Sequence, residues 1–150
     1  EVYGLKTVCL RYFNVFGPRQ DPKSEYAAVI PRFVTRILQG KPPVIYGDGQ
    51  QTRDFTFVKD VVKANILAGQ GDAEGVFNIA CGRRISLNEL AGLIMEIVGR
   101  QVEPLYDKPR TGDIRDSLAD ISAAVEALGY HPDYDMNSGL KETIKWFQKI

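Results

Sequence analysis

Apolar, β-prone runs alternate along this chain with stretches that carry apolar residues at helical spacing. Strands are expected over 7–13, 44–46, 54–58, 76–81 and 102–106, and helices over 28–38, 61–69, 87–98, 121–128 and 140–147. The alternation of strands with helices predicts the α/β class. The runs 7–13 and 76–81 are largely apolar, so both are expected to be buried on both faces, as strands of a parallel sheet are.

Local signals sharpen several of these boundaries. Ser86 and Glu89 have the spacing of a capping box, which predicts that a helix begins there, and Gly99 predicts its end. Pro31 lies inside the 28–38 pattern and fits the first turn of a helix. Residues 1–4 have the pattern of a last helical turn closed by Gly4, so the chain is expected to be a fragment of a longer protein.

Composition excludes several classes of protein. Of the 150 residues, 44% are apolar and 25% are charged, which is typical of a folded domain and not of a disordered chain. The 19 basic residues balance the 19 acidic ones, so nucleic acid is not an expected partner, and no apolar run is long enough for a membrane helix. The two cysteines form no C-x-x-C pair and there is one histidine, so no metal site and a reducing, cytoplasmic setting are expected.

The sequence lacks the motifs that would mark a catalytic centre. Gly69, Gly71 and Gly75 come nearest to a G-x-G-x-x-G turn, but their spacing differs by one residue and they follow a helix instead of a strand. No tyrosine is followed four residues later by a lysine, and His131 lies alone in a polar loop. No catalytic residue is therefore expected in these 150 residues.

Three polar segments stand out instead, at 11–19, 46–55 and 108–117. Asn14 follows a buried strand at the end where parallel sheets bind ligands, although it could simply cap a turn. Arg53 is suited to bidentate phosphate binding, although it could form a surface pair with Asp54. The segment 108–117 mixes cations and carboxylates and could be a solvated charge cluster.

Taken together, these segments resemble the C-terminal half of the extended short-chain dehydrogenase/reductase family, and in particular its nucleotide-sugar 4-epimerases. The resemblance rests on RYFNVFGP at 11–18, AVIP at 28–31, GDG at 47–49 with RDF at 53–55, FNI at 77–79 and RTGDIR at 110–115. It covers nearly the whole chain and is nearest to the branch that acts on UDP-N-acetylhexosamines. The family's N-terminal glycine-rich turn and its Tyr-x-x-x-Lys pair have no counterpart here.

The resemblance implies a domain organisation and a cofactor. Residues 1–150 would be the C-terminal fragment of an NAD-dependent epimerase, mainly its small α/β substrate-binding domain. Residues 7–13 and 58–81 would belong to the dinucleotide-binding domain and supply two strands of its Rossmann-type parallel sheet. NAD would be bound mainly by the missing N-terminal half, and Tyr12 and Phe13 would lie against its nicotinamide.

The resemblance also assigns roles in binding a UDP-sugar. Asn14 would bind near the diphosphate, Arg53 and Arg110 would hold the phosphates, and Asp113 would hold the ribose hydroxyls. The residues that would line the uridine side are Ala28, Val29, Phe33, Ile45 and Tyr46. Ser117 would border the sugar, where a small side chain admits an N-acetyl group that a tyrosine would exclude.

Three functions remain open on the sequence alone. The first is the UDP-sugar-binding half of a UDP-glucose/UDP-N-acetylglucosamine 4-epimerase, which inverts C4 through a 4-keto intermediate and would be inactive alone. The second is a nucleotide-sugar dehydratase or UDP-glucuronate decarboxylase of the same family. The third is a standalone nucleotide-binding or interaction module without catalysis. The expected partners are a UDP-sugar, the missing N-terminal half and a second copy of the protein in a homo-oligomer.

Overall fold

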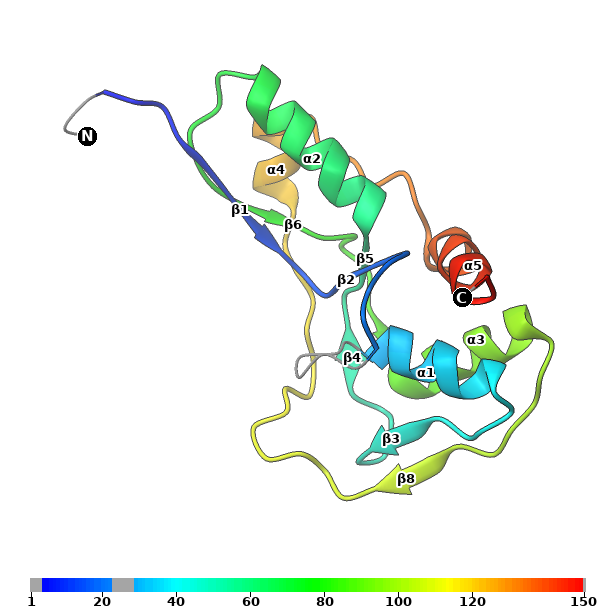
Figure 1. The fold of residues 1–150 in the computed structure, drawn as a ribbon. Coiled ribbons are helices and arrows are strands. Elements are labelled where there is room, and N and C mark those ends of the chain that lie inside the picture. The colour runs from blue at the N-terminus through cyan, green and yellow to red at the C-terminus, as the bar shows by residue number, and fades with distance from the viewer. Residues whose placement is uncertain (1–3, 23–28, 150) are drawn as a thin grey trace.

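The computed structural model describes residues 4–22 and 29–149, which form a mixed α/β structure (Figure 1). The helices are α1 (Val29–Leu38), α2 (Val58–Gln70), α3 (Leu87–Val98), α4 (Ser122–Leu128) and α5 (Met136–Phe147). The strands are β1 (Val8–Tyr12), β2 (Val15–Phe16), β3 (Val44–Tyr46), β4 (Thr52–Arg53), β5 (Thr56–Phe57), β6 (Gly75–Ile79), β7 (Ile85–Ser86) and β8 (Leu105–Asp107). The α/β class is confirmed. The expected helix end at residues 1–3 and the candidate residue Ala28 lie outside the described residues.

One lobe of the molecule, called here the sheet lobe, is built from β1, β6, α2 and α4 (Figure 1). β1 and β6 pair in parallel with Val8 opposite Gly75 and Tyr12 opposite Ile79, as the expectation of two parallel strands required. Its buried residues are Val61, Ala64, Phe77, Ile79, Ala124, Leu128 and Tyr130. Tyr130 is fully buried, and its phenol donates a hydrogen bond to the Ala80 carbonyl 3.1 Å away.

The expectation that these two strands are buried on both faces is wrong for this chain. Val8 and Leu10 pack against the core of the sheet lobe, whereas Cys9 between them is exposed. Val76 on β6 is also exposed, with 57% of its surface accessible. The physical reason is that the described helices α2 and α4 cover one face of the strand pair and nothing described covers the other.

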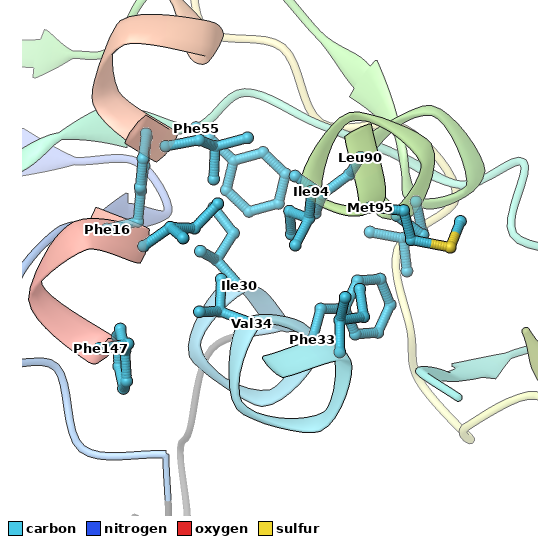
Figure 2. Close-up of a cluster of buried hydrophobic side chains, with 14 of the residues drawn as sticks. Phe16, Ile30, Phe33, Val34, Phe55, Leu90, Ile94, Met95 and Phe147 are labelled. Carbon is cyan, nitrogen blue, oxygen red and sulfur yellow. The ribbon is translucent and has the colours of Figure 1, made fainter. Parts of the chain in front are cut away.

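The other lobe, called here the helical lobe, packs α1, α3 and α5 against β2 and β5. Figure 2 shows Ile30, Phe33 and Val34 of α1 directed toward Leu90, Ile94 and Met95 of α3, and Phe16 and Phe55 beside them. β2 pairs with β5 in parallel, β3 with β8 in parallel, and β4 with β7 in antiparallel fashion. The two separate cores agree in outline with a two-domain division, but the assignment of 7–13 and 58–81 to a dinucleotide-binding domain stays a prediction.

The strand expected over 54–58 forms only in part: β5 covers Thr56–Phe57, and α2 already begins at Val58. Asp54 lies outside both, and its buried carboxylate accepts hydrogen bonds from the backbone N–H groups of Cys81, Gly82 and Ala119. One side chain thus ties three segments together, and its burial raises the pKa of Asp54.

Candidate functional site

A cleft of about 320 Å³ opens in the helical lobe between α1, β3, β4 and the loop 108–116. Seven of the residues singled out in the sequence line it: Asn14, Val29, Phe33, Tyr46, Arg53, Arg110 and Asp113. They come from five separate segments of the chain, so their convergence is a product of the fold. The residues added by the structure are Arg32, Arg36, Val44, Gln51, Phe55 and Leu87.

Two of the arginines that line the cleft contact other residues of the cleft. The Arg110 guanidinium lies over the Tyr46 ring, 4.0 Å from the ring centroid, in a cation–π contact. Arg53 pairs with the Asp113 carboxylate and donates a second hydrogen bond to the Thr52 carbonyl. The alternative of an Arg53–Asp54 surface pair is wrong, since Asp54 is buried and accepts only backbone N–H groups.

The loop 108–116 that carries Arg110 and Asp113 is exposed but anchored at its C-terminal end. The Thr52 N–H donates to the Arg115 carbonyl at 2.9 Å, and the Ser117 N–H donates to the Thr52 carbonyl at 3.1 Å. Arg115 also pairs with Asp48 at 2.7 Å, which lowers the pKa of the Asp48 carboxyl and raises the pKa of Arg115. These contacts hold the loop beside β4, the strand that carries Arg53. A solvated charge cluster would lack such contacts with the rest of the fold.

Four arginines against one aspartate make the cleft cationic among the described residues that line it. Guanidinium groups suit phosphate oxygens, and the apolar walls from Val29, Phe33 and Val44 suit a flat base. Arg32 and Arg36 were missed by the sequence analysis. The sequence pattern could have indicated them, because residues 29, 32, 33 and 36 lie on one side of the predicted helix.

Asn14 lies at the carboxyl end of β1 and lines the cleft with a backbone φ of +35°. Its side-chain amide N–H donates to the Asp54 carbonyl at 2.9 Å. Because Asp54 is 40 positions away in sequence, this contact is not the local turn cap considered above. Asn14 instead joins its own segment to the one after β4, and it also lines the cleft.

Three of the other candidate residues lie elsewhere. Ile45 is fully buried in the core of the helical lobe, because neighbouring residues of a strand point to opposite faces and Tyr46 faces the cleft. Ser117 is half-buried beside Thr52 and does not line the cleft. Tyr12 lies on the sheet lobe, where it is 46% exposed and donates a hydrogen bond to Asn65.

Two of the described residues, Tyr12 and Phe13, were expected to contact a dinucleotide. Tyr12 and Phe13 follow one another at the carboxyl end of a parallel strand, and the accessible Tyr12 ring could pack against a flat nicotinamide. The chain has no glycine-rich strand-to-helix turn for a pyrophosphate. A role of Tyr12 and Phe13 in holding a cofactor stays a prediction.

Two features are absent from the described residues: a cluster of metal-binding side chains and a membrane-spanning helix. Over 4–22 and 29–149, no group of three histidine, cysteine, aspartate or glutamate side chains is placed to hold a metal ion. Within the same ranges, no helix has both the length and the apolar character needed to cross a membrane.

Comparison with known proteins identifies the group to which this chain is related. Residues 1–80 match the model of the NAD dependent epimerase/dehydratase family. The chain belongs to this family. The curated relatives include a putative UDP-glucose 4-epimerase from Methanocaldococcus jannaschii, which is 44% identical over 99% of this chain and 48% of its own length.

Two solved structures share the fold closely. A UDP-N-acetylglucosamine 4-epimerase from Methanobrevibacter ruminantium, in complex with UDP-N-acetylmuramic acid, is 50% identical with a TM-score of 0.94 over 98% of this chain and 47% of that one. A UDP-glucose 4-epimerase from Thermotoga maritima, with UDP-glucose, is 47% identical with a TM-score of 0.94 over the same shares. The chain thus spans about half the length of the relatives it matches, and the expected family is confirmed.

Proposed function

We propose that this chain supplies the UDP-sugar-binding part of an NAD-dependent UDP-sugar 4-epimerase that acts on UDP-glucose or UDP-N-acetylglucosamine. The observation that carries the proposal is the cationic cleft, in which Arg110 lies over the aromatic face of Tyr46 and Arg53 lines the same cleft. A diphosphate needs cationic donors, and a pyrimidine base needs an aromatic or apolar surface. Related epimerases with bound UDP-sugars support this choice of ligand.

Ligand binding would exchange the Arg53–Asp113 ion pair and the Arg110–Tyr46 cation–π contact for contacts with the nucleotide. The diphosphate would replace the Asp113 carboxylate at Arg53, and the released carboxylate could accept hydrogen bonds from the ribose hydroxyls. Arg110 would move from the Tyr46 ring toward the phosphates and leave the ring free for the base. The paired arrangement therefore keeps these charges partly neutralised until a ligand arrives.

Catalysis would depend on protein beyond these 150 residues. NAD would supply the hydride acceptor and donor for C4, and Tyr12 and Phe13 of this chain would pack against its nicotinamide. No tyrosine here is followed by a lysine at the fourth position, so the acid–base pair would come from the rest of the family fold. We expect the chain by itself to bind UDP-sugars without converting them.

The experiment that tests the proposal is calorimetric titration of the chain with UDP and with UMP, using Arg53→Ala. UDP should bind the unaltered chain more tightly than UMP does. Removing one charged hydrogen-bonding group should cost about 1.5–3 kcal/mol of UDP affinity and much less for UMP. In the complete enzyme, the same variant should raise KM more than it lowers kcat, because a diphosphate contact is present before and during the reaction.

Arg100→Ala is the matched control, since Arg100 is exposed after the end of α3 and does not line the cleft. It should leave both affinities unchanged. Failure of the unaltered chain to bind UDP, or equal losses for UDP and UMP in Arg53→Ala, would contradict the proposed diphosphate contact.

The choice of sugar gives a second prediction. If Ser117 borders the sugar, Ser117→Tyr should weaken binding of UDP-N-acetylglucosamine while UDP-glucose binding is retained, because overpacking costs about 1–3 kcal/mol. Competition titrations against UDP measure both affinities. Equal effects on the two sugars would remove Ser117 as the residue that admits the N-acetyl group.

A further inference from the structure

A second cleft of about 510 Å³ lies between the start of α5, the middle of α3 and the segment 81–85 after β6. Phe16 and Phe57 lie beneath it but are only 2% and 1% exposed, so the accessible apolar lining comes from the half-buried Ile85, Leu93, Tyr134 and Met136. Cys81 also lines it, but burial raises the pKa of this thiol to about 11, so it stays a neutral apolar group. Such a volume and lining fit a small flat molecule.

The rim of the second cleft carries unmatched hydrogen-bond donors. Arg83 is exposed and makes no hydrogen bond or ion pair with any residue in the described ranges. Arg84 has only a 3.5 Å contact with Asp116. The guanidinium groups therefore retain most of their N–H groups for a ligand.

The two carboxylates on the same rim are already engaged. Glu89 accepts hydrogen bonds from the N–H and hydroxyl of Ser86. Asp135 caps α5 by accepting from the N–H and hydroxyl of Ser138. The rim therefore has more unused hydrogen-bond donors than unused acceptors. This balance favours a ligand with negatively charged acceptor oxygens.

One short pair of strands contributes residues to both this cleft and the candidate nucleotide cleft. Ile85 of β7 lines the second cleft, and its register partner Arg53 of β4 lines the first. Phe55 lines both. The two clefts are therefore neighbours.

We propose that the second cleft is a binding site for a small amphipathic anion, with a flat apolar body against Leu93, Tyr134 and Met136 and a carboxylate held by Arg83. The apolar body contributes by leaving water for this apolar lining. The carboxylate contributes a charge-assisted, bidentate hydrogen bond to a guanidinium that makes no hydrogen bond or close ion pair within the described residues and otherwise attracts Asp135 through its charge. The site is independent of whether the first cleft binds a nucleotide.

The test uses 2-naphthoate as the probe and methyl resonances in nuclear magnetic resonance spectra of the chain. Saturable shifts are expected at Ile85, Leu93 and Met136, which line the second cleft, and not at Val29 or Val44, which line the first. Arg83→Gln should weaken 2-naphthoate binding at least tenfold and leave binding of the neutral 2-naphthylmethanol unchanged. Arg100→Gln, outside both clefts, should alter neither.

Three results would overturn the proposal. They are the absence of saturable shifts, shifts centred on the first cleft, and an Arg83→Gln variant that binds 2-naphthoate as well as the unaltered chain does. A chain that failed to bind UDP but gave the expected naphthoate shifts would contradict the proposed function alone.

Discussion

At the scale of single residues, Gly139 shows how packing can reverse an intrinsic preference. It lies within α5, where alanine is ordinarily preferred over glycine by about 1 kcal/mol. A Cβ at this position would lie 2.8 Å from Phe16 Cζ and 3.1 Å from Phe57 Cδ2. Both rings are almost completely buried and cannot turn aside.

Gly139→Ala should therefore lower the free energy of unfolding, because overpacking of about 1–3 kcal/mol exceeds the gain in helix propensity. Urea unfolding measures the change. Gly92→Ala is the matched control, because Gly92 is in α3 and a Cβ there would meet no atom within 4 Å. The control should stabilise the chain, and a stabilised Gly139→Ala variant would show that the two rings can yield.

At the scale of elements, the start of α3 depends on a reciprocal cap. Ser86 Oγ accepts a hydrogen bond from the Glu89 N–H, and Glu89 accepts hydrogen bonds from the Ser86 N–H and hydroxyl. Ser86→Ala should cost about 1 kcal/mol of stability, as loss of a capping side chain usually does. Urea unfolding at neutral pH measures this cost.

The same cap predicts a dependence on pH. The hydrogen bonds from Ser86 lower the pKa of Glu89 below its ordinary value of 4.5. A carboxyl whose pKa is lowered by folding stabilises the fold above its unfolded pKa and loses that contribution as the pH falls through its folded pKa. The cost of Glu89→Gln should therefore be present at neutral pH and disappear on acidification.

Unfolding of the Glu89→Gln variant over a series of pH values measures this effect. Glu96→Gln is the control, since Glu96 is exposed on the same helix and its carboxylate makes no hydrogen bond in the described part of the chain. A cost for Glu89→Gln that stays constant with pH would contradict the role of the charged cap.

The elements also show which features the sequence could predict. The boundaries of α3 were predictable because Ser86, Glu89 and Gly99 act through local hydrogen bonds and backbone conformation, and the structure confirms all three. The division of 54–58 was not predictable, because it depends on N–H groups of residues 81, 82 and 119 that reach Asp54 only in the folded chain. Local rules contain no information about partners so distant in sequence.

The same reasoning applies to the candidate cleft. The polar segments that carry Tyr46, Arg53 and Arg110 stood out in the sequence, the resemblance to a family gave these residues their roles, and the structure brings them together in one cleft. Ile45 was assigned with Tyr46, although strand alternation alone places the two side chains on opposite faces. Arg32 and Arg36 were recoverable from helical spacing, but only once the opposite wall of the cleft was known.

At the scale of the whole molecule, the sheet lobe presents an incomplete sheet. Among the described residues, β1 pairs with β6 alone, so its other edge offers unpaired N–H and C=O groups. The face of the pair that carries Cys9 and Val76 is exposed as well. Parallel sheets are ordinarily covered on both faces.

We therefore expect the chain to associate with itself through this face and edge, because an open apolar strand is a template for pairing with another chain. Sedimentation velocity over a range of concentrations, under reducing conditions, measures the association.

Val76→Lys places a charge on the exposed face and should increase the fraction of monomer. Val62→Lys is the matched control, since Val62 is equally exposed, at 53%, on α2 instead of the strand pair. A chain that remains a single monomer at every concentration, and unfolds cooperatively, would show that one covered face is enough to stabilise the sheet lobe.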